Sequence, residues 1–377
     1  MTMSNSAEGL NEDKPLISGN NNHVVRRVVK VTLLFMGLAV LALVFHNNAN
    51  HFASFLPTSY YFHPPPFSAA SSSSSSQEVG DLMLDGVLKN ASMKDRTVIV
   101  TTLNDAWAEP NSVLDLFLHS FRIGNQTQWL LNHLVIICLD DKAYARCLAS
   151  HPHCYDLRSR GDNFTNEAFF MTPNYLKMMW TRIDLLASIL QMGYNFVFTD
   201  ADVMWFRDPF QRFYSNADFQ IACDKYVGNP DDVKNHPNGG FTYVISNNRT
   251  IPFYKFWYRS REDYKGMHDQ DVLNKIKSHP FIKKIGIRMK FLDTAYFGGF
   301  CEPSKDLNLV CTMHANCCVG QPNKVHDLKI LLEDWIKFTS LPAATKASSP
   351  SSWTVPDYCS LEAILQGRKV LGTHLTQ

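Results

Sequence analysis

The sequence predicts an α/β domain with a largely parallel sheet, attached to a single N-terminal transmembrane helix. Short apolar runs typical of buried strands alternate with helical patterns, which indicates helices packed on a parallel sheet. One of these runs leads directly into an Asp-x-Asp pair. A third observation, an almost uncharged apolar stretch near the N-terminus, predicts the membrane helix. About 280 of the 377 residues follow the N-terminal part, enough for one large domain or two small ones.

The apolar stretch Val28–Phe45 contains a single charge, Lys30, and as a helix it would span about 27 Å. Arg26 and Arg27 precede it. The positive-inside rule therefore predicts that residues 1–27 form a cytosolic tail and that the rest of the chain is lumenal. A cleaved signal peptide is the alternative, but the long polar leader and the lack of a small-x-small cleavage site argue against it.

Residues 46–93 are predicted to form a flexible stem, because they contain Pro64–Pro66 and the serine run Ser71–Ser76. Such a composition cannot bury enough apolar surface to offset its ordering entropy. The main domain is then expected over residues 94–340, followed by a C-terminal segment, 341–377; the Ser/Pro/Ala-rich stretch Ser340–Trp353 is expected to be loose.

Charge and cysteine content restrict the function classes. The formal net charge is +1, which excludes the electrostatic footprint of a nucleic-acid-binding protein. Nine cysteines show no zinc-type spacing, and some could pair in an oxidising compartment, although Cys317 and Cys318 are not expected to bridge each other. Glycosylation triplets, all on the predicted lumenal side, begin at Asn90, Asn125, Asn163 and Asn248.

Apolar runs and periodicity place the elements of the domain. Strands are expected at Thr97–Thr102, Leu134–Leu139, Phe196–Thr199, Phe219–Ala222 and Phe241–Ser246. Helices are expected at Asn111–Phe121, Tyr175–Met192 and Val272–Lys277. The second helix is the clearest, because its apolar residues fall on one face and Gly193 follows its end.

The strand Phe196–Thr199 runs directly into Asp200-Ala201-Asp202. Ligands of open α/β sheets bind at the carboxyl ends of strands, and two carboxylates there suit Mn²⁺ or Mg²⁺. Such an ion would neutralise a bound diphosphate and stabilise a leaving nucleotide. The alternative is a solvated acidic turn. A phosphatase-type nucleophile motif is disfavoured, because Met204 replaces its usual Thr or Val and the pair lies more than a hundred residues into the domain.

Other candidates are weaker as isolated signals. His314, following a predicted strand, could supply a third metal ligand or could be an ordinary core or surface histidine. The glycines of Asn238-Gly239-Gly240, which precede a predicted strand, could let the backbone approach a ligand or could simply form a turn. Asp269, expected before a short helix, could orient a sugar hydroxyl or the acceptor, or could act as an N-cap.

Lys177 and Arg182 lie on the polar face of the long helix and could reach phosphate oxygens or remain solvated. Thr101, Thr102 and Asn104 end the first strand, where a base or ribose could rest. The catalytic candidates are Asp269 and Gln270, and the metal candidates are Asp200, Asp202 and His314. The donor-binding candidates are Thr101, Thr102, Asn104, Lys177, Arg182, Asp200, Ala201, Asn238, Gly239 and Gly240.

Four segments in this order, DADVMWFRDPF from Asp200, NGGF from Asn238, HDQD from His268 and MHANC from Met313, carry a family resemblance. Together they resemble the nucleotide-diphospho-sugar transferase domain of plant glycosyltransferase family 77. The resemblance covers about residues 95–335. The anchor and stem fit the usual Golgi layout of such enzymes, as single-pass type II proteins with a lumenal catalytic head.

The resemblance implies a GT-A fold, in which a Rossmann-like nucleotide-binding sheet is fused with an acceptor-binding part. It implies a UDP-sugar donor, Mn²⁺, and retention of anomeric configuration during transfer to a cell-wall glycan or glycoprotein. In the family pattern Asp200 and Asp202 match the metal motif and His314 the late metal ligand. Asp269 is the best match for the acid near the reacting sugar; no nucleophilic carboxylate is obvious. A lumenal binding or scaffolding protein without turnover is the alternative, which the retained metal candidates disfavour.

Overall fold

A computed structural model describes residues 71–160, 164, 171–348 and 352–360. The chain divides into two units, 1–67 and 68–377, and every described residue belongs to the second. The expected tail, transmembrane helix and first part of the stem therefore lie outside the described residues. Among the described helices, none combines the length and the apolarity that crossing a membrane requires.

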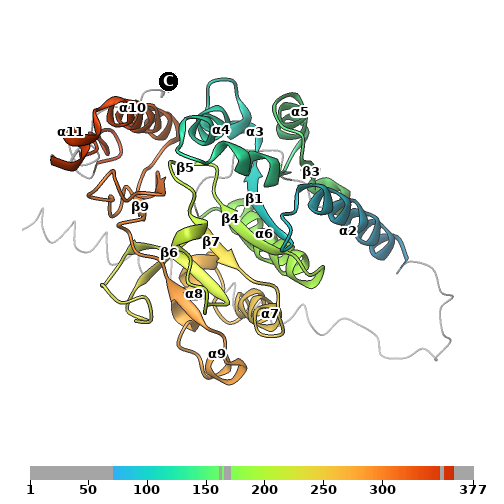
Figure 1. The fold of residues 1–377 in the computed structure, drawn as a ribbon. Helices are drawn as coiled ribbons and strands as arrows, with labels where there is room; N and C mark the ends of the chain where they lie inside the picture. Colours follow the sequence, from blue (N-terminus) through green and yellow to red (C-terminus); the bar gives the residue numbers. More distant parts are fainter. Residues whose placement is uncertain (1–70, 161–163, 165–170, 349–351, 361–377) are drawn as a thin grey trace, which may run out of the picture. The chain divides into compact units, whose positions relative to one another are not determined.

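A seven-stranded sheet forms the centre of the described part, in the order β3-β2-β1-β4-β7-β6-β8 (Figure 1). Its strands are β1 Thr97–Leu103, β2 Leu134–Cys138, β3 Cys154–Asp156, β4 Asn195–Thr199, β6 Phe219–Lys225, β7 His236–Val244 and β8 Met289–Phe291. All neighbouring pairs are parallel except those that involve β7, which runs antiparallel to β4 and β6. The connection from β6 to β7, residues 226–235, is shorter than the crossover of about a dozen or more residues that parallel neighbours need. The predicted α/β class is confirmed, with a mixed rather than fully parallel sheet.

Helices cover both faces of this sheet. They are α2 Ser71–Ala91, α3 Asp105–Ala108, α4 Val113–Ile123, α5 Asp141–Ser150, α6 Pro173–Gln191, α7 Thr250–Ser260, α8 Asp269–Ile276, α9 Pro280–Ile285, α10 Gln321–Ser340 and α11 Ala343–Ser348. Alternating residues of each strand enter opposite cores, as a period of two requires: Val98 and Val100 pack with α2 and α6, whereas Ile99 packs with α4 and α10. Gly193 has φ +81°, so it ends α6 as expected.

A second, three-stranded sheet positions the functional residues. It has the order β5-β10-β9, with β5 Val203–Trp205, β9 Phe297–Gly299 and β10 Thr312–His314. β5 begins directly after the Asp-x-Asp turn and pairs antiparallel with β10. The register places His314 opposite Val203, which brings this histidine beside the aspartates.

The expected stem boundary at residue 93 is wrong, because α2 folds onto the domain. Leu84, Leu88 and Ala91 recur at helical spacing and are fully buried. The Tyr155 hydroxyl also donates a hydrogen bond to the Gly80 carbonyl (3.0 Å). The serine-rich composition of the preceding run concealed this short amphipathic stripe.

The expectation that Ser340–Trp353 is loose also needs correction where the structure describes this stretch. Residues 343–348 form α11, and residues 352–360 are tied to α10 by hydrogen bonds and to Cys318 by a disulfide. Cys317 and Cys318 do not bridge each other, as predicted, but pair with Cys301 and Cys359.

Candidate metal and donor site

The Asp-x-Asp turn is fixed by backbone hydrogen bonds on both sides. The Asp200 amide donates to the Gly240 carbonyl of β7 (2.7 Å), and the Ala315 amide donates to the Asp202 carbonyl (3.0 Å). The Val203 amide closes the turn on the Asp200 carbonyl (3.1 Å). Both aspartates are thus held in place by β7 and by the end of β10.

Asp200, Asp202 and His314 form a cluster whose potential ligand atoms all lie within 4.8 Å of one another. Nε2 of His314 is 3.1 Å from Oδ1 of Asp202 and 3.9 Å from Oδ2 of Asp200. An octahedral ion with ligands at about 2.1 Å would separate adjacent ligands by about 3.0 Å and opposite ligands by about 4.2 Å. The Asp202 Oδ1 atom is buried and, despite the nearby histidine, has no hydrogen bond of good geometry. This donor set fits a hard divalent cation.

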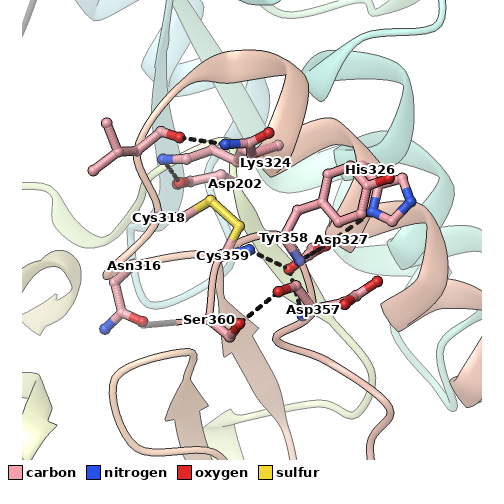
Figure 2. Close-up of a disulfide and its surroundings, with 12 residues drawn as sticks. Asp202, Asn316, Cys318, Lys324, His326, Asp327, Asp357, Tyr358, Cys359 and Ser360 are labelled. Atoms are coloured by element: carbon pink, nitrogen blue, oxygen red, sulfur yellow. Dashed lines mark hydrogen bonds and ion pairs between the residues drawn. A yellow bond between two sulfur atoms is a disulfide. The ribbon is translucent and has the colours of Figure 1, made fainter. Parts of the chain in front are cut away.

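The second oxygen of each carboxylate is held by a cationic side chain. Nη1 of Arg182 lies 3.1 Å from Oδ1 of Asp200. Nζ of Lys324 lies 2.6 Å from Oδ2 of Asp202, as Figure 2 shows. Such outer contacts orient metal-binding carboxylates. Each aspartate therefore directs one oxygen to a fixed cation and the other toward His314.

The charges shift the titration of all three residues of the cluster. Burial raises the pKa of Asp200 above its usual value, although Arg182 opposes the shift. Burial would also raise the pKa of Asp202, but Lys324 and His314 outweigh it and hold that pKa well below its usual range. For His314, burial lowers the pKa, but the attraction of Asp202 prevails and raises it. A histidine binds a metal through its neutral imidazole, so a divalent cation and a proton would compete for Nε2 of His314.

Gly240 makes the close approach of these groups possible. A Cβ atom at Gly240 would lie 2.6 Å from Oδ2 of Asp200 and would also collide with Cε1 of His314. A Cβ atom at Gly239 would meet its nearest neighbours, on Arg182 and Asp269, at 3.5 Å, an ordinary contact. Both glycines lie inside β7, so the expectation that they precede the strand is wrong; a register shift between β6 and β7 allows the longer strand.

Asp269 and Arg182 form a buried ion pair behind Asp200. Nη2 of Arg182 lies 2.6 Å from Oδ2 of Asp269, and burial of the carboxyl is outweighed by this guanidinium, so the pKa of Asp269 is lowered. Arg182 is buried, so the solvated alternative is excluded for this residue. Asp269 is the first residue of α8, and His268 is its N-cap.

A further polar cluster was missed by the sequence analysis. Asp224, at the end of β6, accepts hydrogen bonds from the side-chain amides of Asn238 (2.7 Å), Gln270 (2.9 Å) and Asn316 (2.8 Å). The Gln270 Oε1 atom in turn accepts from the Gly239 amide (2.9 Å). Asp224 follows a buried strand parallel to β4, so its position at the same sheet edge was a usable signal. Asn316 and Lys324 carried no such signal, because no spacing marks them.

The other donor-binding candidates are distributed unevenly. Thr101 is fully buried and its hydroxyl has no hydrogen-bond partner, whereas Asn104 caps α3 by accepting from the Trp107 amide (3.2 Å). Trp107 links this strand end to the metal cluster, since Nζ of Lys324 lies 5.2 Å from its ring centroid. Thr102 is half-buried at the same strand end.

Two candidates do not present a side chain to the cluster. Lys177 is exposed, and its ammonium lies over the ring of Phe164 at 5.2 Å, so the structure does not bring it to the carboxylates. Ala201 is fully buried within the turn, which leaves only its backbone for any ligand contact.

Comparison with known proteins shows the family to which the chain belongs. A family model described as nucleotide-diphospho-sugar transferase matches residues 129–328, more than half of the chain. The chain belongs to the nucleotide-diphospho-sugar transferase family. The family expected from the four sequence segments is confirmed, and this nucleotide-sugar transferase is a glycosyltransferase.

Relatives of the transferase differ in how much of it they match. An uncharacterized protein of Arabidopsis thaliana is 52% identical over 277 residues, 73% of each chain. A UDP-galactose:fucoside α-3-galactosyltransferase of Dictyostelium discoideum is 32% identical over 112 residues, 28% of this chain and 16% of its own. A solved glycosyltransferase involved in glycosylation of the major capsid of PBCV-1 is 9% identical over 62% of this chain and 98% of its own; its TM-score of 0.36 is too low to support an argument.

Proposed function

We propose that this transferase moves a sugar from a UDP-sugar donor to a cell-wall glycan or glycoprotein, with Mn²⁺ or Mg²⁺ held by Asp200, Asp202 and His314. One observation carries the proposal: each aspartate has one oxygen fixed by a cationic side chain and the other converging on Nε2 of His314. Retention of configuration is carried over from the family resemblance.

The local charge supports a diphosphate ligand. With His314 neutral and all three carboxylates ionised, Asp200, Asp202 and Asp269 outnumber the cations of Arg182 and Lys324 by one, which leaves −1 in this group. A bound divalent cation, with His314 neutral, would change this to +1 and would neutralise charge on the leaving nucleotide diphosphate. Arg182 meanwhile keeps Asp200 and Asp269 in place beneath the ligand.

The Asp224 cluster suits the sugar end of the donor. Its amides and carboxylate are hydrogen-bonding groups of the kind that orient sugar hydroxyls. Gln270 connects Asp224 to the backbone amide of Gly239, which is the neighbour of Gly240. Asp269 contacts the same region through Arg182. We assign Asp224 and Gln270 to donor-sugar recognition, and Thr102 and Asn104 to the nucleoside end; the fully buried Thr101 lies beneath them.

A Golgi-lumenal location with an N-terminal membrane anchor belongs to the proposal. Three disulfides among the described residues, Cys147–Cys154, Cys301–Cys317 and Cys318–Cys359, suit an oxidising compartment. Asn90, Asn125 and Asn248 are exposed, as glycosylated asparagines must be. The name of the Dictyostelium relative, which specifies UDP-galactose, supports a UDP-linked donor.

The direct test is release of UDP from a panel of UDP-sugars in Mn²⁺, comparing the wild type with Asp202→Asn. We expect release from at least one donor and a loss of about 100-fold or more in the variant, because the substitution removes the negative charge with which this side chain would bind the metal. Tight Mn²⁺-dependent UDP binding without any turnover on the panel or on candidate acceptors would favour the inactive binding protein instead. Failure to bind UDP with or without Mn²⁺, measured by calorimetry, would contradict the proposal.

A further inference from the structure

We propose that the C-terminal strap, residues 352–360, is a positioning element of the metal and donor site. The strap fixes the loop 315–320 and the start of α10. The loop carries Asn316, which contacts Asp224, and α10 carries Lys324, which contacts Asp202. This inference rests on the proposed function, because its readout is metal-dependent nucleotide binding.

Two buried carboxylates on α10 hold the strap. Asp327, which is fully buried, accepts backbone hydrogen bonds from Asp357 (2.9 Å), Tyr358 (3.0 Å) and Cys359 (2.9 Å). Three hydrogen bonds to one carboxylate are strong, because the acceptor is charged. The strap backbone is therefore fixed where it passes α10 (Figure 2).

A second set of contacts holds the beginning of the strap. Asp334 lies seven residues, or two turns, beyond Asp327 on the same face of α10 and accepts from the amide (2.7 Å) and hydroxyl (2.8 Å) of Thr354. The ring of Trp353 packs against Phe206 at 5.4 Å, and Val355 is buried. The strap is thus packed along α10 as part of the core.

Two disulfides hold the loop between β10 and α10, one to the strap and one to the segment after β9. Cys318 pairs with Cys359 of the strap, and the adjacent Cys317 pairs with Cys301, just after β9. Cys317 has φ +52°, a left-handed conformation that is uncommon for residues other than glycine and persists where the surroundings enforce it. The loop between β10 and α10 is therefore held from both sides.

This loop carries contacts to each part of the candidate site. His314, the last residue of β10 before the loop, faces the metal position, and Asn316 in the loop donates to Asp224 (2.8 Å). Lys324, in the first turns of α10, contacts Asp202 and lies three residues, about one turn, before Asp327. Because a binding site must be held to within about 0.5 Å, the path of this loop decides whether these groups meet their partners.

The experiment compares two disulfide removals of the same kind. Cys318→Ser/Cys359→Ser releases the strap, whereas Cys147→Ser/Cys154→Ser removes a disulfide between α5 and β3, neither of which supplies a residue of the candidate site. Calorimetry gives the Kd for UDP with and without Mn²⁺, and thermal unfolding gives Tm. We expect both double variants to lower Tm, but only the strap variant to weaken Mn²⁺-dependent UDP binding, by about 10-fold or more.

A second variant reaches the strap by another route. Asp327→Asn keeps the disulfide but weakens the hydrogen bonds to the strap, and we expect the same selective loss of Mn²⁺-dependent binding. Unchanged Mn²⁺-dependent Kd in folded forms of these variants, or an equal loss in the Cys147/Cys154 control, would overturn the inference. Absence of UDP binding in the wild type would instead contradict the proposed function, so the two failures are distinguishable.

Discussion

At the scale of single residues, the candidate site depends on Gly240. The backbone of this residue accepts the hydrogen bond from the Asp200 amide, and its missing side chain leaves the space in which Asp200 and His314 approach each other. Gly239 has no such neighbours, although the two glycines are adjacent in β7. Replacing each glycine in turn therefore distinguishes a need for space at Gly240 from a general effect of replacing a glycine in β7.

We predict that Gly240→Ala reduces Mn²⁺-dependent UDP binding by about 100-fold or more, because the new methyl group displaces a metal ligand. Gly239→Ala should change it by less than about 3-fold. Calorimetric titration of each variant with UDP in Mn²⁺ measures both values. Equal effects of the two substitutions would show that the close approach at Gly240 has no special role.

The sequence identified Asp200, Asp202 and His314 because residue type and position agree: a strand leads into two acids, and a late strand leads into a histidine. It could not identify Lys324 or Arg182 as the cations that hold the second carboxylate oxygens. Lys324 lies 122 residues from Asp202 along the chain, and no spacing pattern links them. Such partners are set by tertiary packing alone.

At the scale of elements, α2 shows how composition can conceal a helix. Leu88, on the face of α2 that packs on the domain, is fully buried, whereas Leu82 on the same helix is 75% exposed. We predict that Leu88→Ala lowers the free energy of unfolding by about 3 kcal/mol, since it leaves a core cavity. Leu82→Ala should change it by less than about 0.5 kcal/mol. Urea unfolding of both variants tests this, and matching midpoints would mean that α2 does not pack on the domain.

Asp218 joins the starts of three elements. Its carboxylate, 1% exposed, accepts from Arg249, just before α7, at 2.7 and 2.9 Å and from Arg288, just before β8, at 2.8 and 3.0 Å. Burial alone would raise the pKa of Asp218, but the hydrogen bonds from Arg288 and Arg249 outweigh it and hold the pKa well below its usual range. The ion pairs of Asp218 therefore give their full stabilisation at every pH at which this carboxyl would also be ionised in the unfolded chain.

We predict that Asp218→Asn lowers the free energy of unfolding by about 3 kcal/mol at pH 7. The unfolded pKa of an aspartate is about 3.9, so the difference from wild type should stay constant down to about pH 4 and shrink as the pH falls further, toward the lower folded pKa. Urea unfolding between pH 7 and pH 3 measures it. The pair Asp231–Lys290 (2.6 Å), in which the aspartate is exposed, supplies the control, because Asp231→Asn should cost less than about 1 kcal/mol. A difference that grows on acidification would contradict this assignment.

Element positions were largely predictable, and element partners were not. The expected strands and the long helix agree with β1, β2, β4, β6 and α6, because buried apolar runs and a 3.6-residue period are local signals. The longer β7 and its antiparallel direction depend on pairing with β4 and β6, which no local pattern records. The packing of the strap along α10 could not be predicted for the same reason. Asp327 and Asp334 hold it mainly through hydrogen bonds to its backbone, which no side-chain pattern records.

At the scale of the whole described unit, the candidate site is assembled where the two sheets meet. Asp200 directly follows β4 of the large sheet, Gly240 lies in β7 of the same sheet, and His314 lies in β10 of the small sheet. α6 and α10 add Arg182 and Lys324 from opposite faces of the large sheet. The α/β class and the sheet edge could be predicted from the strand-to-acid pattern, whereas the convergence of four further elements on it could not.

The central claim is that Asp200, Asp202 and His314 hold one divalent cation that also meets a nucleotide diphosphate. Crystals of the transferase grown with MnCl₂ and UDP, with diffraction measured at the manganese absorption edge, test it most directly. We predict a single anomalous peak within about 2.3 Å of Oδ1 of Asp202 and Nε2 of His314, with the UDP phosphates beside it. Ordered UDP with no manganese at these three side chains, or manganese bound elsewhere, would contradict the account.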